Sequence, residues 1–435
     1  MLRDSASFFT ALKMTRKRLK KHMYKTVHLK KGKEESLGRF HPWVFSGAIH
    51  HIDGRPEEGD VVRVISADGR FLAVGHVQIG SIAVRVLSFE DIVIDQVFWK
   101  ERLSAAYAVR RSIFPQWKKN SSSGEGNNSE SRIQESELTN AFRLVHGEGD
   151  GLPGLVIDVY DRTAVMQAHS VGMHVSRREI ADALAEVLDG VIDNIYYKSE
   201  STLAYKASED GGNGFLKGCL ATANDIATEN GLRFHVDWLG GQKTGFFVDQ
   251  RENRALLEHY AKGRKVLNMF CYTGGFSFYA MRGGAELVHS VDSSSRAIDI
   301  TRENVELNFP GDTRHEAFAE DAFKYLDRMG DQYDLIILDP PAFAKHKDAL
   351  RNALMGYRKL NAKAFEKIRP GGILFTFSCS QVVTKDNFRT AVFTAAAMSG
   401  RRVRILHQLT QPADHPISIY HPEGEYLKGL VLYVE

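Results

Sequence analysis

The sequence predicts a multidomain α/β protein whose C-terminal part is a doubly wound, Rossmann-like sheet. Residues 335–338 form an apolar run that ends at Asp339, and a second apolar run ends at Cys379. From about residue 240 the patterns of strands and helices alternate, as they do in a doubly wound sheet. Ligands of such sheets bind outside the carboxyl ends of the strands. We therefore expect Asp339 and Cys379 in one crevice, where a carboxyl and a thiol suggest covalent chemistry on a flat, electrophilic ring.

A glycine-containing turn and an acid at the end of the next strand predict a cofactor site. Residues 265–270 have the pattern of a strand, and residues 271–276 (CYTGGF) predict a tight turn into a helix over 277–282. Glycines let a ligand approach the backbone, and a helix N-terminus offers unpaired N–H groups. Asp292 ends the next strand, 18 residues after Gly274, where this fold places a carboxylate on ribose hydroxyls.

Two common nucleotide-binding classes fit the sequence poorly. The turn is not G-x-G-x-x-G, which makes a nicotinamide dehydrogenase less favoured. The chain also lacks the G-x-x-x-x-G-K-[ST] phosphate loop, which disfavours an NTPase.

Composition indicates a soluble protein of two or three domains. The chain has 435 residues, of which 43% are hydrophobic and 26% charged, and it contains no apolar run long enough to cross a membrane. Its three cysteines, Cys219, Cys271 and Cys379, are too few for a disulfide scaffold and lack zinc-ligand spacing, so we expect a reducing cytoplasm and no metal. Residues 1–33 hold eleven Lys and Arg against one acid, which predicts either a solvated basic tail or an arm that contacts RNA.

Changes of pattern along the chain predict five segments. Short β-like runs separated by turn signals predict a small β-barrel, with a hairpin turn at residues 67–69 between two of them. Helical periodicity over 95–113 is followed by residues 120–129, a stretch low in apolar residues. A mixed α+β pattern comes next, in which residues 155–168 predict a hairpin around Asp161 and Arg162. The predicted segments are a basic extension (1–23), the barrel (24–92), a helix with a mobile linker (93–138), a central α+β domain (139–238) and the doubly wound domain (239–435).

Taken together, several short motifs resemble a known family. They occupy residues 41–47 (HPWVFSG), 148–154, 243–251 (KTGFFVDQR), 268–276, 304–308, 339–341 (DPP), 377–380 (FSCS) and 422–429. The set resembles the class I S-adenosylmethionine-dependent methyltransferases, and specifically the bacterial 23S rRNA cytosine-5 methyltransferases with an N-terminal PUA domain. The resemblance implies that residues 24–92 are a PUA-like RNA-binding barrel. It also implies that S-adenosyl-L-methionine is the cofactor, that 23S rRNA is the partner and that no membrane is involved. A homodimer is a candidate oligomeric state.

The resemblance and the positions at strand ends together assign roles to particular residues. Cys379 is expected to add to cytosine C6 and Asp339 to hold the base at N3 and its amine. Phe343 and Pro340 are expected to contact the substrate. The expected cofactor-binding residues are Gln250, Phe270, Tyr272, Thr273, Gly274, Gly275, Phe276, Asp292, Ser293, Asp321 and Asp339.

Several of these assignments have structural alternatives. Cys379 could be a buried core thiol, Asp321 a helix N-cap and Phe343 a core residue. Cys271 is expected to serve packing. Many relatives carry a second cysteine after the DPP-type motif, and residues 339–343 (DPPAF) have none. The base that releases the product is therefore not identified.

Two other functions stay open at this stage. A guanine N-methyltransferase would use a DPP-type motif without a nucleophilic cysteine, so Cys379 discriminates against it. An RNA-binding ribosome assembly factor with a vestigial cofactor site is opposed by the intact turn, Asp292 and Asp339.

Overall fold

The chain packs as two compact units, each of which draws on separate stretches of sequence. The computed structural model describes residues 24–114, 138–203, 212–223, 225–344 and 346–435. The first unit contains residues up to 129, residues 142–224 and residues 414–424, and the second contains residues 130–141, 225–413 and 425–435. The predicted N-terminal extension and the linker stretch over 120–129 lie outside the described residues.

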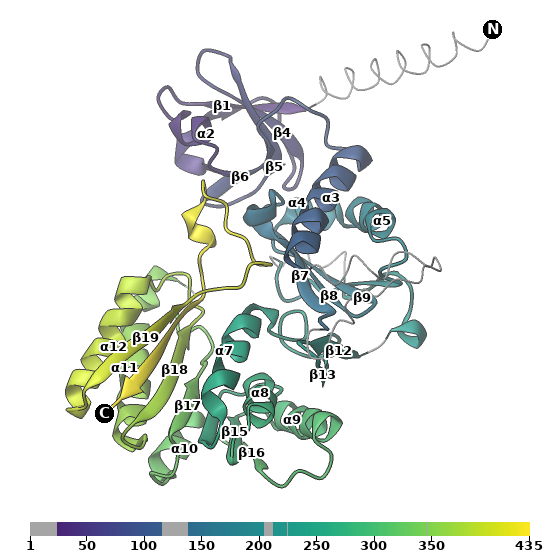
Figure 1. The fold of residues 1–435 in the computed structure, drawn as a ribbon. Helices are drawn as coiled ribbons and strands as arrows, with labels where there is room; N and C mark the ends of the chain where they lie inside the picture. Colours follow the sequence, from purple (N-terminus) through teal and green to yellow (C-terminus); the bar gives the residue numbers. More distant parts are fainter. Residues whose placement is uncertain (1–23, 115–137, 204–211, 224, 345) are drawn as a thin grey trace. The chain divides into compact units, whose positions relative to one another are not determined.

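The N-terminal part of the first unit is a curled, six-stranded mixed sheet (Figure 1). A turn at Ala67-Asp68-Gly69 joins two antiparallel strands as expected, and Gly69 takes the left-handed conformation with φ +83°. Alternate side chains such as Val62, Val64 and Val84 face one buried core. The strands, in the order β2-β6-β5-β4-β1-β3, are β1 (Lys25–Leu29), β2 (Trp43–Phe45), β3 (Ile49–Ile52), β4 (Val61–Ile65), β5 (Phe71–Val77) and β6 (Ile82–Ser88), with the short helix α2 (Glu35–Gly38).

A second sheet and three helices complete the first unit. Asp95 caps α3 by accepting hydrogen bonds from the N–H groups of Val97 and Phe98, and α3 buries Trp99 and Leu103 in the core of this sheet. The predicted hairpin over 155–168 is present, and Asp161 in its turn has φ +50°. The order β11-β10-β9-β8-β7 contains β7 (Ala141–His146), β8 (Leu155–Tyr160), β9 (Thr163–Ala168), β10 (Asn194–Tyr197) and β11 (Gly214–Lys217). The helices are α3 (Gln96–Ile113), α4 (Val171–Val175) and α5 (Arg177–Val187).

The second unit holds the predicted doubly wound sheet, which the structure confirms. Its seven strands have the order β16-β15-β14-β17-β18-β20-β19, and all neighbours are parallel except β20, which runs antiparallel to both β18 and β19. The strands are β14 (Lys265–Met269), β15 (Leu287–Asp292), β16 (His315–Ala319), β17 (Leu335–Leu338), β18 (Gly372–Ser378), β19 (Val403–Leu409) and β20 (Lys428–Val434). The helices are α7 (Arg251–Ala261), α8 (Gly275–Arg282), α9 (Ser295–Asn308), α10 (Ala322–Arg328), α11 (Leu350–Lys367) and α12 (Lys385–Ser399), and a hairpin of β12 (Ile226–Glu229) and β13 (Leu232–His235) precedes them.

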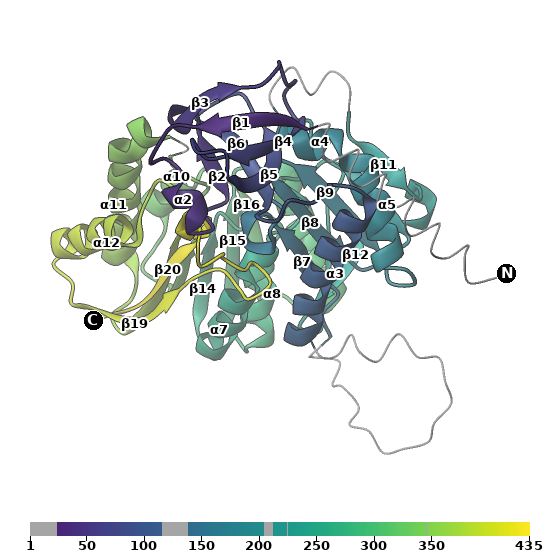
Figure 2. The same ribbon diagram turned by 90° about the horizontal axis from the view of Figure 1, so that it is seen from above.

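Helices cover both faces of this sheet, which explains its continuous apolar strands. Leu267, Ile336 and Leu374 join one core with α10, α11 and α12, whereas their neighbours Val266 and Leu335 join a second core with α7 and α8. Helices α11 and α12 lie side by side on one face (Figures 1 and 2). Because helices cover both faces of the sheet, we expect a ligand to bind at the ends of the strands. In sheets of this kind, ligands bind at the carboxyl ends of the parallel strands.

The C-terminal region of the chain contributes to both units. Residues 414–424, between β19 and β20, belong to the first unit, although sequence analysis assigned them to the doubly wound domain. Within the first unit, Arg110 donates a hydrogen bond to the Asp414 carbonyl (2.8 Å), and the rings of Trp43 and His421 lie 4.3 Å apart. These contacts give the segment a specific place in that unit.

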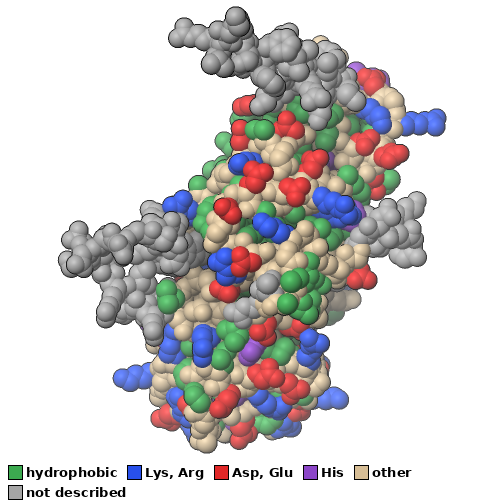
Figure 3. Space-filling model, turned by 90° about the vertical axis from the view of Figure 1, so that its right-hand side faces the viewer, with side chains coloured by type: hydrophobic (Ala, Val, Ile, Leu, Met, Phe, Trp, Pro, Cys, Tyr) green, Lys and Arg blue, Asp and Glu red, His purple; other side chains and the backbone are tan. Residues whose placement is uncertain are grey.

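The face of the molecule drawn in Figure 3 carries charges of both signs in close mixture. On the face drawn in Figure 3, Lys and Arg side chains are interspersed with Asp and Glu side chains, in keeping with the small net charge of +3. Among the described helices, none combines the length and the hydropathy needed to span a bilayer.

Candidate active site

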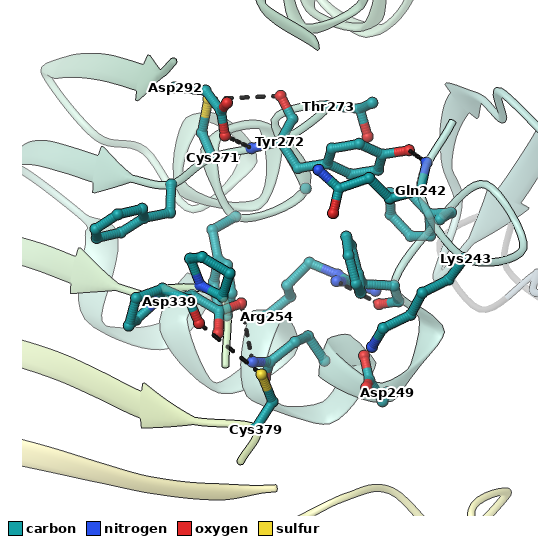
Figure 4. Close-up of a pocket in the computed structure, with 18 of the residues that line it drawn as sticks. Gln242, Lys243, Asp249, Arg254, Cys271, Tyr272, Thr273, Asp292, Asp339 and Cys379 are labelled. Atoms are coloured by element: carbon teal, nitrogen blue, oxygen red, sulfur yellow. Dashed lines mark hydrogen bonds between the residues drawn. The ribbon is translucent and has the colours of Figure 1, made fainter. Parts of the chain in front are cut away.

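A pocket in the second unit lies at the carboxyl ends of the central strands. The turn between β14 and α8, the acid that ends β15, the residues after β17 and the residue after β18 all contribute to it. In Figure 4, Asp292 and Tyr272 lie at one end of the pocket, and Asp339 and Cys379 lie at the other. The lining residues are Gln242, Lys243, Phe246, Phe247, Asp249, Gln250, Arg254, Phe270, Cys271, Tyr272, Thr273, Gly275, Phe276, Asp292, Ser293, Asp339, Pro340, Pro341, Cys379 and Leu427.

The turn between β14 and α8 holds an unusual backbone conformation. Phe270 and Tyr272 have φ angles of +59° and +49°, which are rare for residues with side chains, and Gly274 has φ +86°. A Cβ atom at Gly274 would lie 2.7 Å from Cγ2 of Thr301. Thr301 also donates a hydrogen bond through Oγ1 to the Tyr272 carbonyl (2.9 Å). Left-handed non-glycine residues persist only where surrounding contacts impose them, and they cluster at functional sites.

Asp292 ties this turn to the end of β15. Its Oδ2 accepts a hydrogen bond from the Tyr272 N–H (3.0 Å), and its Oδ1 accepts one from the Ser294 N–H (2.9 Å). A carboxylate oxygen can accept two hydrogen bonds, so both oxygens retain capacity for hydroxyl donors. Nearby, Oγ1 of Thr273 is buried and has no hydrogen-bond partner. The pocket therefore offers polar groups that a ligand can satisfy.

Asp339 is a carboxyl group whose surroundings favour its neutral form. Burial and the neighbouring charge of Asp249 raise the pKa of Asp339 from 3.8 to about 7. The amide of Gln250 is oriented by Asn253, which donates to Gln250 Oε1 (2.6 Å), so that Gln250 Nε2 donates to Asp339 Oδ2 (3.0 Å). Near neutral pH, Asp339 can therefore either donate a proton or accept a hydrogen bond.

Cys379 follows the last residue of β18, and its thiol is partly exposed to the pocket. The Sγ atom lies 3.9 Å from the Pro340 carbonyl, to which it can donate. Burial raises the pKa of Cys379 to about 11, and the nearby ammonium of Lys243 acts in the opposite direction. The Lys243 amine points toward Asp249 in Figure 4. The resting thiol is therefore neutral, and any nucleophilic role requires proton removal or added positive charge.

Most residues predicted for the site meet in this pocket. Of the predicted residues, the structure brings together Gln250, Phe270, Tyr272, Thr273, Gly275, Phe276, Asp292, Ser293, Asp339, Pro340 and Cys379. The joint lining supports considering them as one site, and their individual roles stay predictions.

Gly274, Asp321 and Phe343 do not line the pocket. Gly274 is the N-cap of α8, and its left-handed conformation allows the turn to pass close to Thr301. Asp321 is the N-cap of α10, and its Oδ1 accepts a hydrogen bond from the Lys324 N–H (3.0 Å). The Phe343 ring packs on Tyr357 with centroids 4.6 Å apart, at the edge of the core. The structural alternatives considered for Asp321 and Phe343 thus match their surroundings, and neither predicted ligand contact gains support.

Sequence reasoning did not single out several lining residues. Asp249, Phe246 and Phe247 belong to the 243–251 motif, from which sequence analysis selected only Gln250 as a binding residue. Arg254 pairs with the buried Glu229 through two hydrogen bonds (2.8 and 2.7 Å), which fixes the start of α7 behind the pocket. No local pattern marks this pair, because its members are far apart in sequence.

Comparisons with known proteins agree with this architecture. Residues 195–418 match the S-adenosylmethionine-dependent methyltransferase family, and residues 27–89 match the PUA-like domain. A ribosomal RNA large subunit methyltransferase I from Tolumonas auensis is 41% identical over 416 residues, which cover 94% of this chain and 99% of that protein. The protein of the same name from Shewanella amazonensis is 40% identical over 414 residues, with coverage of 94% and 99%.

Solved structures share the fold over nearly the whole chain. A protein from Streptococcus mutans described as a SAM-dependent methyltransferase superposes with a TM-score of 0.76 at 22% identity, covering 94% of this chain and all of that one. A methyltransferase solved in complex with SAH gives a TM-score of 0.77 at 23% identity, with the same coverage. At this level of identity the likeness establishes the fold.

Proposed function

The chain belongs to the S-adenosylmethionine-dependent methyltransferase family, and on that premise we propose that it methylates C5 of a cytosine in 23S ribosomal RNA. The observation that carries this proposal is the joint lining of one pocket by Cys379, Asp339 and the β14–α8 turn. Methyl transfer to an exocyclic amine needs no thiol, whereas methylation of C5 does, because C5 of cytosine is a poor nucleophile.

The residues of the pocket fit the cofactor. Asp292 can accept hydrogen bonds from the two ribose hydroxyls, and the unpartnered Thr273 Oγ1 can bond the ligand. The turn at 270–274, with its left-handed residues, leads directly into the N-terminus of α8, where helix N–H groups can face an acceptor on a ligand. When bound, S-adenosylmethionine supplies a methyl group on a positively charged sulfur, to be taken up by a C5 atom that has become enamine-like.

The chain's own residues prepare the base for this transfer. In the proposed mechanism the Cys379 thiolate forms a bond to C6. The electrons of the C5–C6 double bond move to form a C4–C5 double bond, and those of the C4–N3 double bond move onto N3. Asp339, whose pKa is about 7, donates its proton to N3 and so neutralises the charge that develops on the ring. After methylation, a base removes the proton from C5, the electron pair of that C–H bond restores the C5–C6 double bond, and the Cys379 thiolate leaves. N3 then returns its proton to the Asp339 carboxylate.

The choice of ribosomal RNA rests on the relatives and on the N-terminal unit. The relatives that cover nearly the whole chain are named ribosomal RNA large subunit methyltransferases. Residues 27–89 match a PUA-like domain, whose expected role is to hold RNA. The few cysteines of the chain suit a reaction in the reducing cytoplasm.

Removal of the thiol tests the proposal. Cys379→Ala should abolish methyl transfer to rRNA while cofactor affinity, measured by calorimetry, stays nearly unchanged. Wild-type enzyme should form a covalent complex with RNA that carries 5-fluorocytosine at the target, because fluorine blocks the loss of the C5 substituent. The alanine variant should form none.

Cys219→Ala is the matched control, since Cys219 is exposed and outside the pocket. This variant should methylate and cross-link like wild type. Robust methylation by a folded Cys379→Ala protein would overturn the cytosine-5 assignment and favour methylation of a guanine amine.

A further inference from the structure

Lys428 is a buried ammonium group that the mechanism above does not use. It is the first residue of β20, and its side chain is only 4% exposed. Lysine is almost never fully buried without a partner, because the desolvated charge is costly. A lysine in this position therefore calls for a reason in its immediate surroundings.

Two contacts place Lys428 across the turn that carries Cys379. In the antiparallel pairing of β18 with β20, Lys428 lies opposite Ser378. Its Nζ donates a hydrogen bond to the carbonyl of Ser380 at 2.6 Å. Cys379 is the residue between these two serines, so Lys428 holds the turn on both sides of the thiol.

A second hydrogen bond anchors the same turn from the side of β17. The Ser380 hydroxyl donates to the Ala344 carbonyl, four residues after Pro340. The thiol lies 3.9 Å from the Pro340 carbonyl. The turn after β18 is thus clamped between the loop after β17 and the ammonium of Lys428, which limits where the sulfur can move.

Lys428 does not line the pocket, although its neighbour Leu427 does. We propose that Lys428 is a positioning residue, which fixes the Cys379 turn and supplies the positive charge that favours its thiolate. This inference rests on the proposed function of Cys379 as a nucleophile.

The charges around the thiol explain why such a lysine is needed. Burial is the main cause that raises the pKa of Cys379, and the carboxylates of Asp339 and Asp249 add to it, whereas the ammonium of Lys243 and a backbone hydrogen bond lower it. Burial lowers the pKa of Lys428 to about 8, and an ionised Cys379 would raise it again. The groups that face this pair are Lys243, Asp249, Asp339 and Tyr357 around the thiol, and Glu425 and Lys385 around the ammonium. At neutral pH Lys428 is mostly charged and opposes the negative charge of Asp249 and that of Asp339 when it is ionised.

The reactivity of the thiol in the full-length protein tests the proposal. The rate of alkylation of Cys379 by iodoacetamide is measured from pH 6 to pH 10 by peptide mass spectrometry, with the exposed Cys219 as the internal reference. Lys428→Met keeps the aliphatic stem and removes both the charge and the donor. We expect it to slow alkylation of Cys379 about tenfold at pH 8, since one unit of pKa is a tenfold change in thiolate. The rate at Cys219 should not change.

Three further variants show whether a change in the alkylation of Cys379 comes from loss of the charge, loss of the hydrogen-bond donor or loss of any nearby lysine. Lys428→Gln keeps a donor without the charge and should shift the profile in the same direction, whereas Lys428→Arg keeps the charge and should restore the wild-type profile. Lys385→Met removes an exposed ammonium that pairs with Glu425, and it should leave the profile unchanged.

Three outcomes would overturn the proposal. The first is a wild-type profile in Lys428→Met, and the second is an equal shift in Lys385→Met. The third is that both neutral variants fail to fold while Lys428→Arg folds, because the charge would then be structural. Alkylation does not depend on the RNA target. A shifted profile in Lys428→Met together with active Cys379→Ala would therefore reject the proposed function alone.

Discussion

The two groups assigned to the chemistry, Asp339 and Cys379, both have pKa values that burial raises. The pKa of Asp339 is raised to about 7 and that of Cys379 to about 11. Under the proposed mechanism the two shifts have opposite effects. A protonated Asp339 is ready to donate to N3, whereas a protonated Cys379 must first be activated. We therefore propose that Lys243 and Lys428, which are cations near the thiol, favour its ionisation.

The raised pKa of Asp339 predicts how stability depends on pH. Between 3.8 and about 7 the folded state holds this proton more tightly than the unfolded state does. Stability should therefore fall as pH rises through that window and level off above it. Asp339→Asn removes the group that titrates. Its stability should match wild type near pH 4 and exceed it above pH 7 by on the order of 1–2 kcal/mol, a value reduced because the side chain keeps partial exposure.

Urea unfolding at a series of pH values measures this difference. Asp299→Asn, which removes an exposed carboxylate on α9, is the control for a change of charge at the surface. A constant difference between Asp339→Asn and wild type from pH 4 to pH 8 would show that Asp339 is not held in its neutral form.

At the scale of elements, the turn between β14 and α8 is the most constrained part of the site. Sequence analysis expected the glycines of this turn to let a ligand approach the backbone. The structure instead also places Phe270 and Tyr272 in the left-handed region, with Thr301 bonded to the Tyr272 carbonyl. Contacts from α9 therefore stabilise the conformation of the turn. Glycine is needed at position 274, because a Cβ atom there would lie too close to the Thr301 side chain.

Gly274→Ala tests this account of the turn. A left-handed alanine costs roughly 1–2 kcal/mol, and here the added Cβ would also lie 2.7 Å from Thr301 Cγ2. We expect both a loss of stability in urea unfolding and a loss of cofactor affinity of about tenfold in calorimetry, since each 1.4 kcal/mol is tenfold.

Gly311→Ala is the matched control, because Gly311 has φ +71° and its added Cβ would meet no atom within 4 Å. Gly311→Ala should lower the free energy of unfolding by the cost of a left-handed alanine, and its cofactor affinity should not change. Equal losses in the two variants would show that the contact with Thr301 is not important for the turn.

At the scale of the whole molecule, the two units are linked by more than one passage of the chain. Residues 414–424 leave the second unit after β19, join the first, and return to begin β20 at Lys428. The Asp414 carbonyl accepts a hydrogen bond from the fully buried Arg110 within the first unit. The start of β20, and with it the proposed partner of Cys379, thus follows directly from a segment that belongs to the other unit.

Removal of the N-terminal sheet should separate binding of RNA from binding of cofactor. The cut belongs before α3, near residue 91, because Phe98, Trp99 and Leu103 are part of the central core. The shortened chain should bind S-adenosylmethionine within about twofold of wild type and methylate rRNA at least about tenfold more slowly. The salt dependence of RNA binding should also weaken, since phosphate contacts are lost.

Calorimetry, methylation assays and RNA titrations at several salt concentrations measure these changes, with circular dichroism to establish folding. An unchanged methylation rate in the shortened chain would remove the RNA-anchoring role from residues 24–90.

Local sequence was enough to predict several of the strands, two hairpin turns and the strand ends at which the pocket lies. Apolar runs before Asp339 and Cys379 predicted buried parallel strands, and helix and hairpin signals at Asp95 and residues 67–69 were confirmed. Asp292 was placed by its distance from the turn. These features depend on short-range periodicity and on backbone preferences, which neighbouring residues determine among themselves.

Only the tertiary structure decided which distant groups meet. The insertion of β20 between β18 and β19 brings Lys428 to the Cys379 turn, and the packing of residues 243–250 brings Asp249 to Asp339. Residues 414–424 join the other unit, and Phe343 packs on Tyr357. The apolar pattern of a strand predicts which of its faces is buried, but it does not predict which strands are its neighbours in the sheet. The pKa values and the positions of the groups proposed for catalysis depend on those neighbours, so they follow from long-range packing alone.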